Sequence, residues 1–354
     1  MSSNNRVLSI DYAKAFGIIV VVLGHYPVMV FDTVLPYYYH MPLFFFIGGL
    51  CMKTEISILN ALKKTFINYY IYIVILFIII AALTNMVNAF FSIPHTNILA
   101  SSIIDILITT LKSNFHNNTN FLVAWFLFAY SITSILSLIL AKVFQALSKK
   151  IILPMALIIG YIGMTYTSSK YSENGLYYYN VITQILVGIM YYMIGYACKN
   201  NIQKAKSITL AIISFLVLFI SYRLDMSAPM EMAWSKYPFG FVTQLITSFS
   251  GIYIIIYISN ILAKSNKVSI LTMIGKSSKY IMSYHMFIFF AIEQILFRTG
   301  IFEYMDNRGI NKPIAFLPIN IISALFIPIL IKYFTDKSFN KVNVFYDKHS
   351  FFKR

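Results

Sequence analysis

Long apolar runs recur from one end of the 354-residue chain to the other, and they restrict the fold more than any other feature. Only 11% of the residues are charged and 59% are hydrophobic, whereas about a quarter of the residues of a soluble domain are charged. No polar stretch is long enough to build a water-soluble core of its own. We therefore expect an all-α, polytopic integral membrane protein with a single transmembrane domain over residues 1–354.

The apolar runs, separated by turn residues and charged residues, predict about ten membrane-spanning helices. These spans cover residues 7–31, 36–52, 65–91, 121–145, 151–167, 180–198, 206–223, 239–263, 270–297 and 313–334. Residues 98–114 are amphipathic, and we expect them to form a helix at the membrane interface rather than an eleventh span.

Basic residues outnumber acidic ones and give the chain a net charge of +16. They occur singly or in pairs between the apolar runs, which argues against a nucleic-acid-binding surface and is typical of topology signals. Most of them fall in alternate loops that are cytoplasmic if the N-terminus is inside the cell. The sequence therefore predicts that both termini lie in the cytoplasm.

The first apolar run, "KAFGIIVVVLGH", begins at Lys14 and ends at His25. On a helix these residues lie about 20° from eclipsed and roughly 16 Å apart along the axis, with Asp11 about 60° from Lys14 on the same side. Ionisable residues are costly in lipid, so this polar stripe should face the bundle interior. A structural role stays open, in which Lys14 pairs with Asp11 and His25 hydrogen-bonds in a helix contact.

Four further side chains are candidates for a site within the membrane. His40 lies a turn or so into the second run, near the depth of His25, although a lone histidine there is more often an anchor than a catalyst. Trp125 lies early in the fourth run, where an aromatic-belt role is the ordinary expectation. The ninth run holds His285 near mid-membrane, with Glu293 two turns farther out.

Other chemistry has little support in the sequence. There is no glycine-rich phosphate loop, no serine-hydrolase motif and no closely spaced set of metal ligands. We predict no metal site and no tightly bound cofactor. In the second run, Gly48 and Gly49 are expected to permit close helix packing.

The pattern "LSIDYAKAFGIIVVVLGH", followed by "YHMPLFFFIGG", resembles the membrane-bound acyltransferase family 3. This family includes bacterial sugar O-acetylases similar to fucose 4-O-acetylase. Lys14 and His25 match its signature of a basic residue and a histidine separated by ten residues, and His40, Pro42 and Gly49 match its second helix. The segments at 125–127, 194–196 and 274–285 resemble later landmarks. The chain departs from the family pattern at Lys14, where Arg is more common, and at Gly48, where Ser is more common.

The resemblance implies an O-acyltransferase of the bacterial plasma membrane that takes an acyl group, usually acetyl, from cytoplasmic acyl-CoA. The acceptor is expected to be a sugar hydroxyl of a cell-envelope polysaccharide, with membrane lipid and the polysaccharide biosynthesis machinery as neighbours. His25 is expected to be the general base or the acyl carrier, because an imidazole titrates near neutrality. Lys14 is expected near the donor. The candidates for the substrate path are Asp11, His40, Trp125, His285 and Glu293.

Two readings compete with that of an enzyme. A transporter or lipid-linked glycan flippase also uses about ten spans and buried ionisable residues. A non-catalytic membrane partner of a polysaccharide synthase is the third. The resemblance favours the acyltransferase over both.

Overall fold

The structure, a computed structural model, describes residues 3–26, 36–92, 103–147, 149–224, 231–264, 268–298 and 316–349. These residues form helices joined by turns, and the only extended pairing among them is one bridge between Glu231 and Lys236. The all-α prediction is therefore confirmed. The α-helices are α1 (Ser3–Gly24), α2 (His40–Cys51), α3 (Ile58–Thr65), α4 (Tyr72–Phe90), α5 (Ile103–Lys112), α6 (Ala124–Leu147), α7 (Ile152–Ile162), α8 (Ser168–Asn174), α9 (Tyr177–Cys198), α10 (Ile208–Arg223), α11 (Gly240–Leu262), α12 (Ser269–Lys276), α13 (Ser278–Arg298) and α14 (Leu317–His349).

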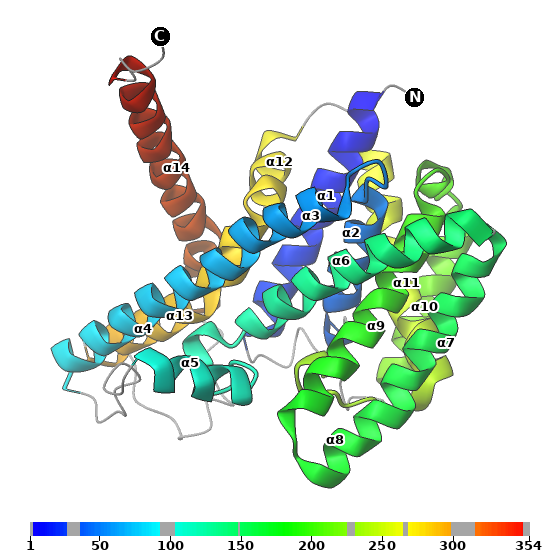
Figure 1. Cartoon of the computed structure of the whole chain (residues 1–354), viewed down its shortest axis with the longest axis horizontal. Helices are drawn as coiled ribbons and strands as arrows, with labels where there is room; N and C mark the ends of the chain where they lie inside the picture. Colours follow the sequence, from blue (N-terminus) through cyan, green and yellow to red (C-terminus); the bar gives the residue numbers. More distant parts are fainter. Residues whose placement is uncertain are drawn as a thin grey trace.

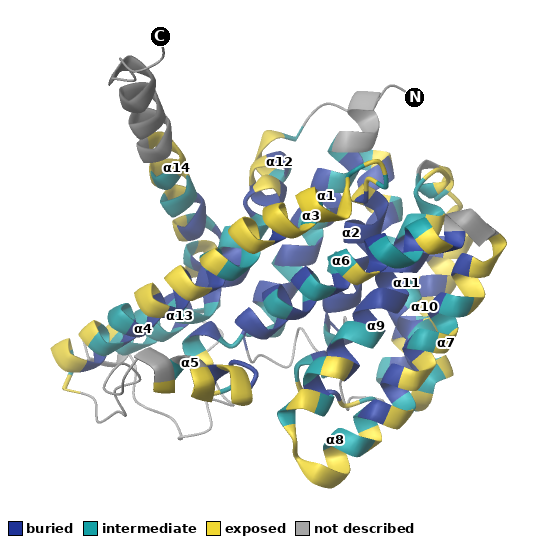
Figure 2. Ribbon diagram, in the orientation of Figure 1, coloured by how far each residue is buried: buried dark blue, intermediate teal, exposed yellow. Residues whose placement is uncertain are grey.

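The buried centre of the molecule is made by α1, α2, α9 and α11 (Figure 1). Helix α2 packs along α9, and α1 packs against α2, α11 and α12. Figure 2 shows these central helices largely buried, while α4, α7 and α10 carry exposed faces. Because the exposed faces are apolar, they suit contact with lipid tails rather than water.

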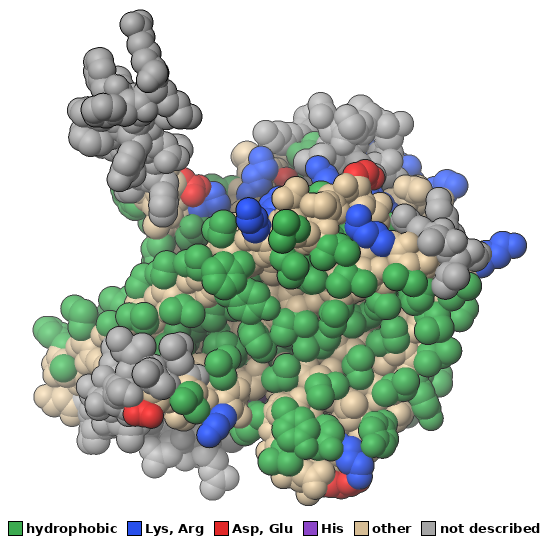
Figure 3. Space-filling model, in the orientation of Figure 1, with side chains coloured by type: hydrophobic (Ala, Val, Ile, Leu, Met, Phe, Trp, Pro, Cys, Tyr) green, Lys and Arg blue, Asp and Glu red, His purple; other side chains and the backbone are tan. Residues whose placement is uncertain are grey.

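Charged side chains gather toward the two ends of the molecule, and hydrophobic side chains cover the band between them (Figure 3). More Lys and Arg side chains are visible at the end where α1 begins and α14 ends than at the opposite end. This distribution agrees with a membrane protein whose termini share one side. The assignment of that side to the cytoplasm stays a prediction.

Six helical stretches in the described residues are long and apolar enough to cross a membrane, by length and composition. They are Ile58–Phe90, Thr119–Phe144, Ile152–Asn174, Tyr177–Cys198, Gly240–Leu262 and Leu317–Lys337. Each overlaps a span that the sequence predicts. The predicted number of about ten is not established by these six.

Several predicted boundaries differ from the structure. The stretch predicted at 65–91 begins at Ile58, because α3 continues through Phe66–Ile71, a π-helical segment, into α4. Lys63 and Lys64 are exposed, and lysine is a good helix former. The helix therefore continues through these two charged residues instead of ending at them. The span predicted at 270–297 is interrupted at Ser277, which separates α12 from α13.

Helix α5 is short within the part of the chain that the structure describes. It has 10 residues, and at a rise of about 1.5 Å per residue it is roughly 15 Å long. That is about half the thickness of the hydrocarbon core of a bilayer, so the described residues of α5 are too few to span it. The start of the predicted segment, residues 98–102, lies outside the described residues.

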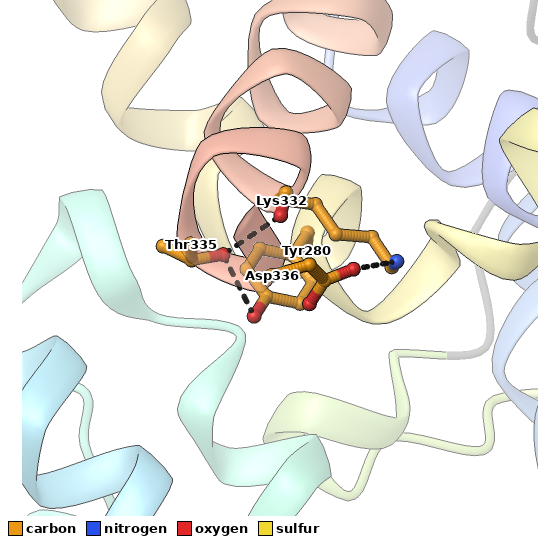
Figure 4. A network of polar contacts seen from close by, with 4 residues as sticks. All are labelled: Tyr280, Lys332, Thr335 and Asp336. Carbon is orange, nitrogen blue, oxygen red and sulfur yellow. Dashed lines mark hydrogen bonds and ion pairs between the residues drawn. The ribbon is translucent and has the colours of Figure 1, made fainter. Parts of the chain in front are cut away.

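Helix α14 is joined to α13 by polar contacts as well as by packing (Figure 4). The Tyr280 hydroxyl of α13 lies 3.4 Å from the Thr335 hydroxyl of α14. Thr335 also donates to the carbonyl of Lys332, whose ammonium group pairs with Asp336. Such contacts fix the orientation of α14 on α13 at the end of α13 that carries Lys279.

Candidate active site

Three histidines from three helical elements lie together in the structure. His25 follows the last residue of α1, His40 is the first residue of α2, and His285 lies in α13. The ring centroid of His25 is 5.2 Å from that of His285 and 6.4 Å from that of His40. Tyr37 completes the group, with its ring centroid 5.1 Å from His40 and 6.0 Å from His25.

Backbone carbonyls hold two of these imidazoles. Nδ1 of His40 hydrogen-bonds the carbonyl of Pro36, and Nδ1 of His285 lies 2.9 Å from the carbonyl of Met282. His40 and His285 are 4% and 0% exposed, whereas His25 is half-buried. His25 is therefore the most accessible imidazole of the three.

The cavity beside His25, called here the histidine cavity, has a volume of about 270 Å³. Its lining is rich in side chains that are both polar and aromatic, and the chain's only two tryptophans are among them. Its lining residues are His25, Tyr37, His40, Met41, Leu122, Val123, Trp125, Glu231, Met232, Ala233, Trp234, Met282 and Met286.

A second cavity, called the middle cavity, has a volume of about 220 Å³ and shares Met282 with the histidine cavity. Lys14 and Lys279 line it, as does Tyr130 of α6. The ammonium nitrogen of Lys14 lies 3.9 Å from a carboxylate oxygen of Asp11. That of Lys279 donates to the carbonyl of Asn68.

A third cavity, called the lysine cavity, has a volume of about 500 Å³ and lies against α2, α3 and α6. It shares Cys51, Tyr69 and Lys279 with the middle cavity. Lys53 and Lys64 also line it, and none of its described lining residues is acidic. The three cavities thus form a row, with lysines toward one end and imidazoles at the other.

The structure brings most of the predicted site residues to this row. His25, His40 and Trp125 line the histidine cavity, and Lys14 lines the middle cavity. Asp11 is buried and reaches the row only through its ion pair with Lys14. This ion pair is the one that the structural reading of Lys14 expects, and the hydrogen-bonded helix contact that the same reading expects of His25 stays a prediction.

Two candidates lie behind the cavity walls. His285 is in contact with His25 without lining the cavity. Glu293 is half-buried two turns farther along α13 and interacts electrostatically with Tyr26, away from the described lining of all three cavities.

The aromatic-belt reading of Trp125 is wrong. Its side chain is only 5% exposed, so it lies inside the protein rather than at a lipid-facing surface. The sequence could not reveal this, because α6 is apolar on both its lipid-facing and its inward faces.

Among the charged or aromatic lining residues that sequence reasoning missed are Glu231, Trp234 and Lys279. The first two lie in the segment between α10 and α11, where no helical periodicity indicates a direction. Lys279 was counted as a topology signal among the basic residues between runs. The rarity of tryptophan was the one available signal, since the chain has two.

Among the described residues, no group of three or more His, Cys, Asp or Glu side chains is arranged to hold a metal ion. The chain matches the family model of an acyltransferase domain over residues 7–333, which is nearly its whole length. Comparisons with curated proteins and with solved structures gave no match.

Proposed function

The chain belongs to the acyltransferase 3 family and is a membrane acyltransferase, and from this we propose that it is an O-acyltransferase that modifies a sugar of the cell envelope. The donor is a cytoplasmic acyl-CoA, with acetyl-CoA as the expected form, and the acceptor is a hydroxyl group of a polysaccharide or glycan. The row of three cavities is the observation that carries the proposal.

The lysine end of the row suits the donor. Coenzyme A carries phosphate groups, and Lys53, Lys64 and Lys279 supply positive charge without an opposing carboxylate in the described lining. Lysine meets phosphate as a point charge, which tolerates varied geometry. The flexible arm of the donor would pass Lys14 in the middle cavity and bring its thioester toward Met282, where the histidine cavity begins.

The histidine end suits the transfer step. A neutral His25 takes the proton of the acceptor hydroxyl while the oxygen attacks the thioester carbonyl carbon. The carbon–sulfur bond then breaks, the coenzyme A thiolate leaves, and the imidazolium returns the proton to it. The products are an ester and a free thiol. In a two-step route, His25 carries the acyl group before passing it to the hydroxyl, and both routes need the imidazole at this position.

His40 and His285 act as positioning residues in this proposal. Their backbone hydrogen bonds fix how they pack around His25, so the His25 ring has few orientations available. Holding a base in a productive orientation lowers the entropic part of the barrier.

The test compares the envelope glycan of cells that make the wild type with that of cells that make His25→Ala at equal protein level. Mass spectrometry and mild base release measure ester content. We expect the ester to be lost in the variant, because general-base catalysis contributes about 10²–10⁴-fold to rate.

A control variant, Tyr178→Ala, changes an exposed aromatic residue of α9 outside the described lining of the histidine cavity and should leave the ester content unchanged. Unchanged ester in His25→Ala would contradict the proposed role of His25. Absence of ester in wild-type glycan would contradict O-acylation of that acceptor. Loss of the polymer itself would favour an export role.

A further inference from the structure

The histidine cavity has one wall that comes from a loop rather than from the helix bundle. Residues 231–236, between α10 and α11, contribute Glu231, Met232, Ala233 and Trp234 to its lining. The other charged or aromatic lining residues come from the ends of α1, α2 and α6 and from the short 3-10 helix Pro36–Tyr38, which position the proposed chemistry. The loop therefore adds a carboxylate and an indole that the transfer step itself does not use.

Buried amide side chains hold this loop in place. The carbonyl of Ala233 accepts hydrogen bonds from Asn180 and Gln184, at 2.9 and 3.0 Å. The Asn180 amide also donates to the Ser235 hydroxyl, and Asn114 joins the same network by donating to Asn180 and Gln184. Because these amides are almost fully buried, leaving them unpaired would be costly, so the network fixes the loop strongly.

The backbone of the loop is held in an unusual conformation. Ser235 has φ 51°, in the left-handed region that few residues other than glycine adopt. Its carbonyl accepts a hydrogen bond from the Ser168 hydroxyl, which ties the loop to α8. Strained positions that the surroundings over-determine are concentrated at ligand sites, which supports a binding role for this loop.

The side chains of Trp234 and Glu231 each contact a neighbouring side chain but remain partly exposed. The ring of His116 lies 4.1 Å from that of Trp234 and supports the indole, which is still 37% exposed. Burial lowers the pKa of His116, so this support is uncharged at neutral pH. The Glu231 carboxylate lies 3.0 Å from the Lys236 ammonium group and its side chain is 30% exposed.

The lining chemistry favours one class of acceptor. A lipid acyl chain could pack on the methionine, leucine and valine side chains of the lining but would offer no hydrogen bond to Glu231, and an anionic acceptor would be repelled by the Glu231 carboxylate. A neutral carbohydrate has C–H faces that pack on aromatic rings and hydroxyl groups that donate hydrogen bonds to a carboxylate. Two indoles, one tyrosine and one carboxylate around a cavity of about 270 Å³ match those two features.

We propose that Glu231 and Trp234 of the 231–236 loop recognise the carbohydrate acceptor of the enzyme, with Trp234 as the stacking surface and Glu231 as the group that binds acceptor hydroxyls. This inference rests on the proposed function, because it describes the acceptor side of the same site. Glu231 would then determine specificity, because a sugar with a suitably placed hydroxyl can donate a hydrogen bond to its carboxylate and a sugar without that hydroxyl cannot.

Tryptophan fluorescence can test binding without any acyl transfer. Both tryptophans of the chain line the histidine cavity, so indole emission reports on that cavity alone. The full chain in lipid nanodiscs is titrated with a panel of methyl glycosides of hexoses and 6-deoxyhexoses. Light that tyrosine does not absorb excites the indoles.

We expect at least one neutral glycoside to shift the emission saturably. In Glu231→Gln its Kd should rise about tenfold or more, since a hydrogen bond to a charged group is lost. Trp234→Ala should weaken binding, and Trp234→Phe should restore part of it. Melting temperatures of all variants must match the wild type within a few degrees, and a variant that fails this check is replaced by Glu231→Asp or Trp234→Tyr.

Two controls separate recognition from loop folding. Lys236→Met removes the ion pair but leaves the Glu231 carboxylate, so its Kd should stay within about twofold of the wild type. Glu173→Gln breaks a similar ion pair, with Lys170, in α8 and should change nothing. If Lys236→Met bound the sugar as weakly as Glu231→Gln does, Glu231 would act through its ion pair in the structure of the loop, and its proposed recognition role would be wrong.

The outcomes distinguish this inference from the proposed function. If a sugar binds saturably but no ester forms, the recognition role of Glu231 and Trp234 would stand, and the proposal that the sugar is acylated would fail. Ester formation with no emission shift in the wild type, or with an unchanged Kd in Glu231→Gln, would overturn that recognition role and retain the acyltransferase.

Discussion

The hydrogen-bonding state of an imidazole decides whether it can accept a proton, and the backbone sets that state for two histidines of the cluster. A carbonyl oxygen can only accept, so Nδ1 carries the hydrogen in His40 and in His285. In a neutral ring the lone pair is then on Nε2. For His285, Nε2 has no hydrogen-bond partner among the described residues, and His25 is its neighbour. A small rotation of either ring would let His285 accept from His25 and stabilise an imidazolium there.

Lys14 offers a prediction on donor binding. In Lys14→Ala, the KM for acyl-CoA should rise about tenfold or more, because a hydrogen bond from a charged ammonium group to a carbonyl oxygen in the arm of the donor is lost. In Lys14→Arg the KM should stay near that of the wild type, since the charge is kept. Initial rates with purified protein in proteoliposomes measure both.

The matched control for this prediction is Lys170→Ala, which removes an exposed lysine paired with Glu173 at the opposite end of the molecule. It should leave KM unchanged. The same KM in the wild type, Lys14→Ala and Lys14→Arg would show that Lys14 serves the structure through Asp11 and not the donor.

Helical phase and depth follow from numbering, and with them the sequence indicates Lys14, His25 and His40 but not Lys279, a basic residue at the start of α13. Lys14 and His25 are expected on one stripe, and His40 is expected near the depth of His25. In the structure Lys14 and His25 line two adjoining cavities, and the ring centroids of His25 and His40 lie 6.4 Å apart. Glu231 and Trp234 could not be found this way, since a loop reaches the cavity only through the tertiary contacts of Ala233 and Ser235.

At the scale of elements, the pairing of α2 with α9 determines how closely the cavity walls approach. Glycines lie on both helices where their backbones meet. A Cβ atom added to Gly49 would collide with the carbonyl oxygen of Tyr192, and one added to Gly195 would collide with that of Phe46. The expectation that Gly48 and Gly49 permit close packing is confirmed.

Gly49→Ala should therefore destabilise the protein by about 1–3 kcal/mol, the usual cost of overpacking. Thermal melting of the purified protein in detergent, followed by size-exclusion chromatography, measures the effect as a lower Tm. The control is Gly175→Asn, at the left-handed end of α8, where nothing lies within 4 Å and asparagine tolerates the backbone conformation. Equal melting of Gly49→Ala and the wild type would mean that α2 and α9 are not in backbone contact.

Helix boundaries were harder to predict than helix identities. Apolar runs mark where a helix can be buried in lipid, but helices extend past them wherever good helix formers follow. For this reason Lys63 and Lys64 lie inside the Ile58–Phe90 stretch. The break at Ser277 was also unsignalled. Two residues before it, Gly275 packs so closely on α1 that an added Cβ atom would collide with the carbonyl oxygen of Asp11.

At the scale of the whole molecule, the row of cavities runs between the two charged ends, with its lysine end at the end that carries more Lys and Arg side chains. The lysine cavity lies at the end where α1 begins and α14 ends, and the histidine cavity lies where α1 ends and α2 begins. The proposed transfer needs the first end in the cytoplasm and the second outside it. The proposed function therefore depends on the orientation of the protein in the membrane. That residues 1–354 form a single domain stays a prediction.

Cysteine labelling tests this orientation with two matched glutamates. The chain has two cysteines, so Cys51→Ser with Cys198→Ser gives a cysteine-free background. Glu55 lies in the turn between α2 and α3 beside the lysine cavity, Glu173 lies in α8 at the opposite end, and both are exposed. On intact cells, a membrane-impermeant maleimide should label Glu173→Cys at once and Glu55→Cys only after permeabilisation. The reverse pattern would put the lysine cavity outside the cell, away from any cytoplasmic acyl-CoA, and the proposed direction of transfer would be wrong.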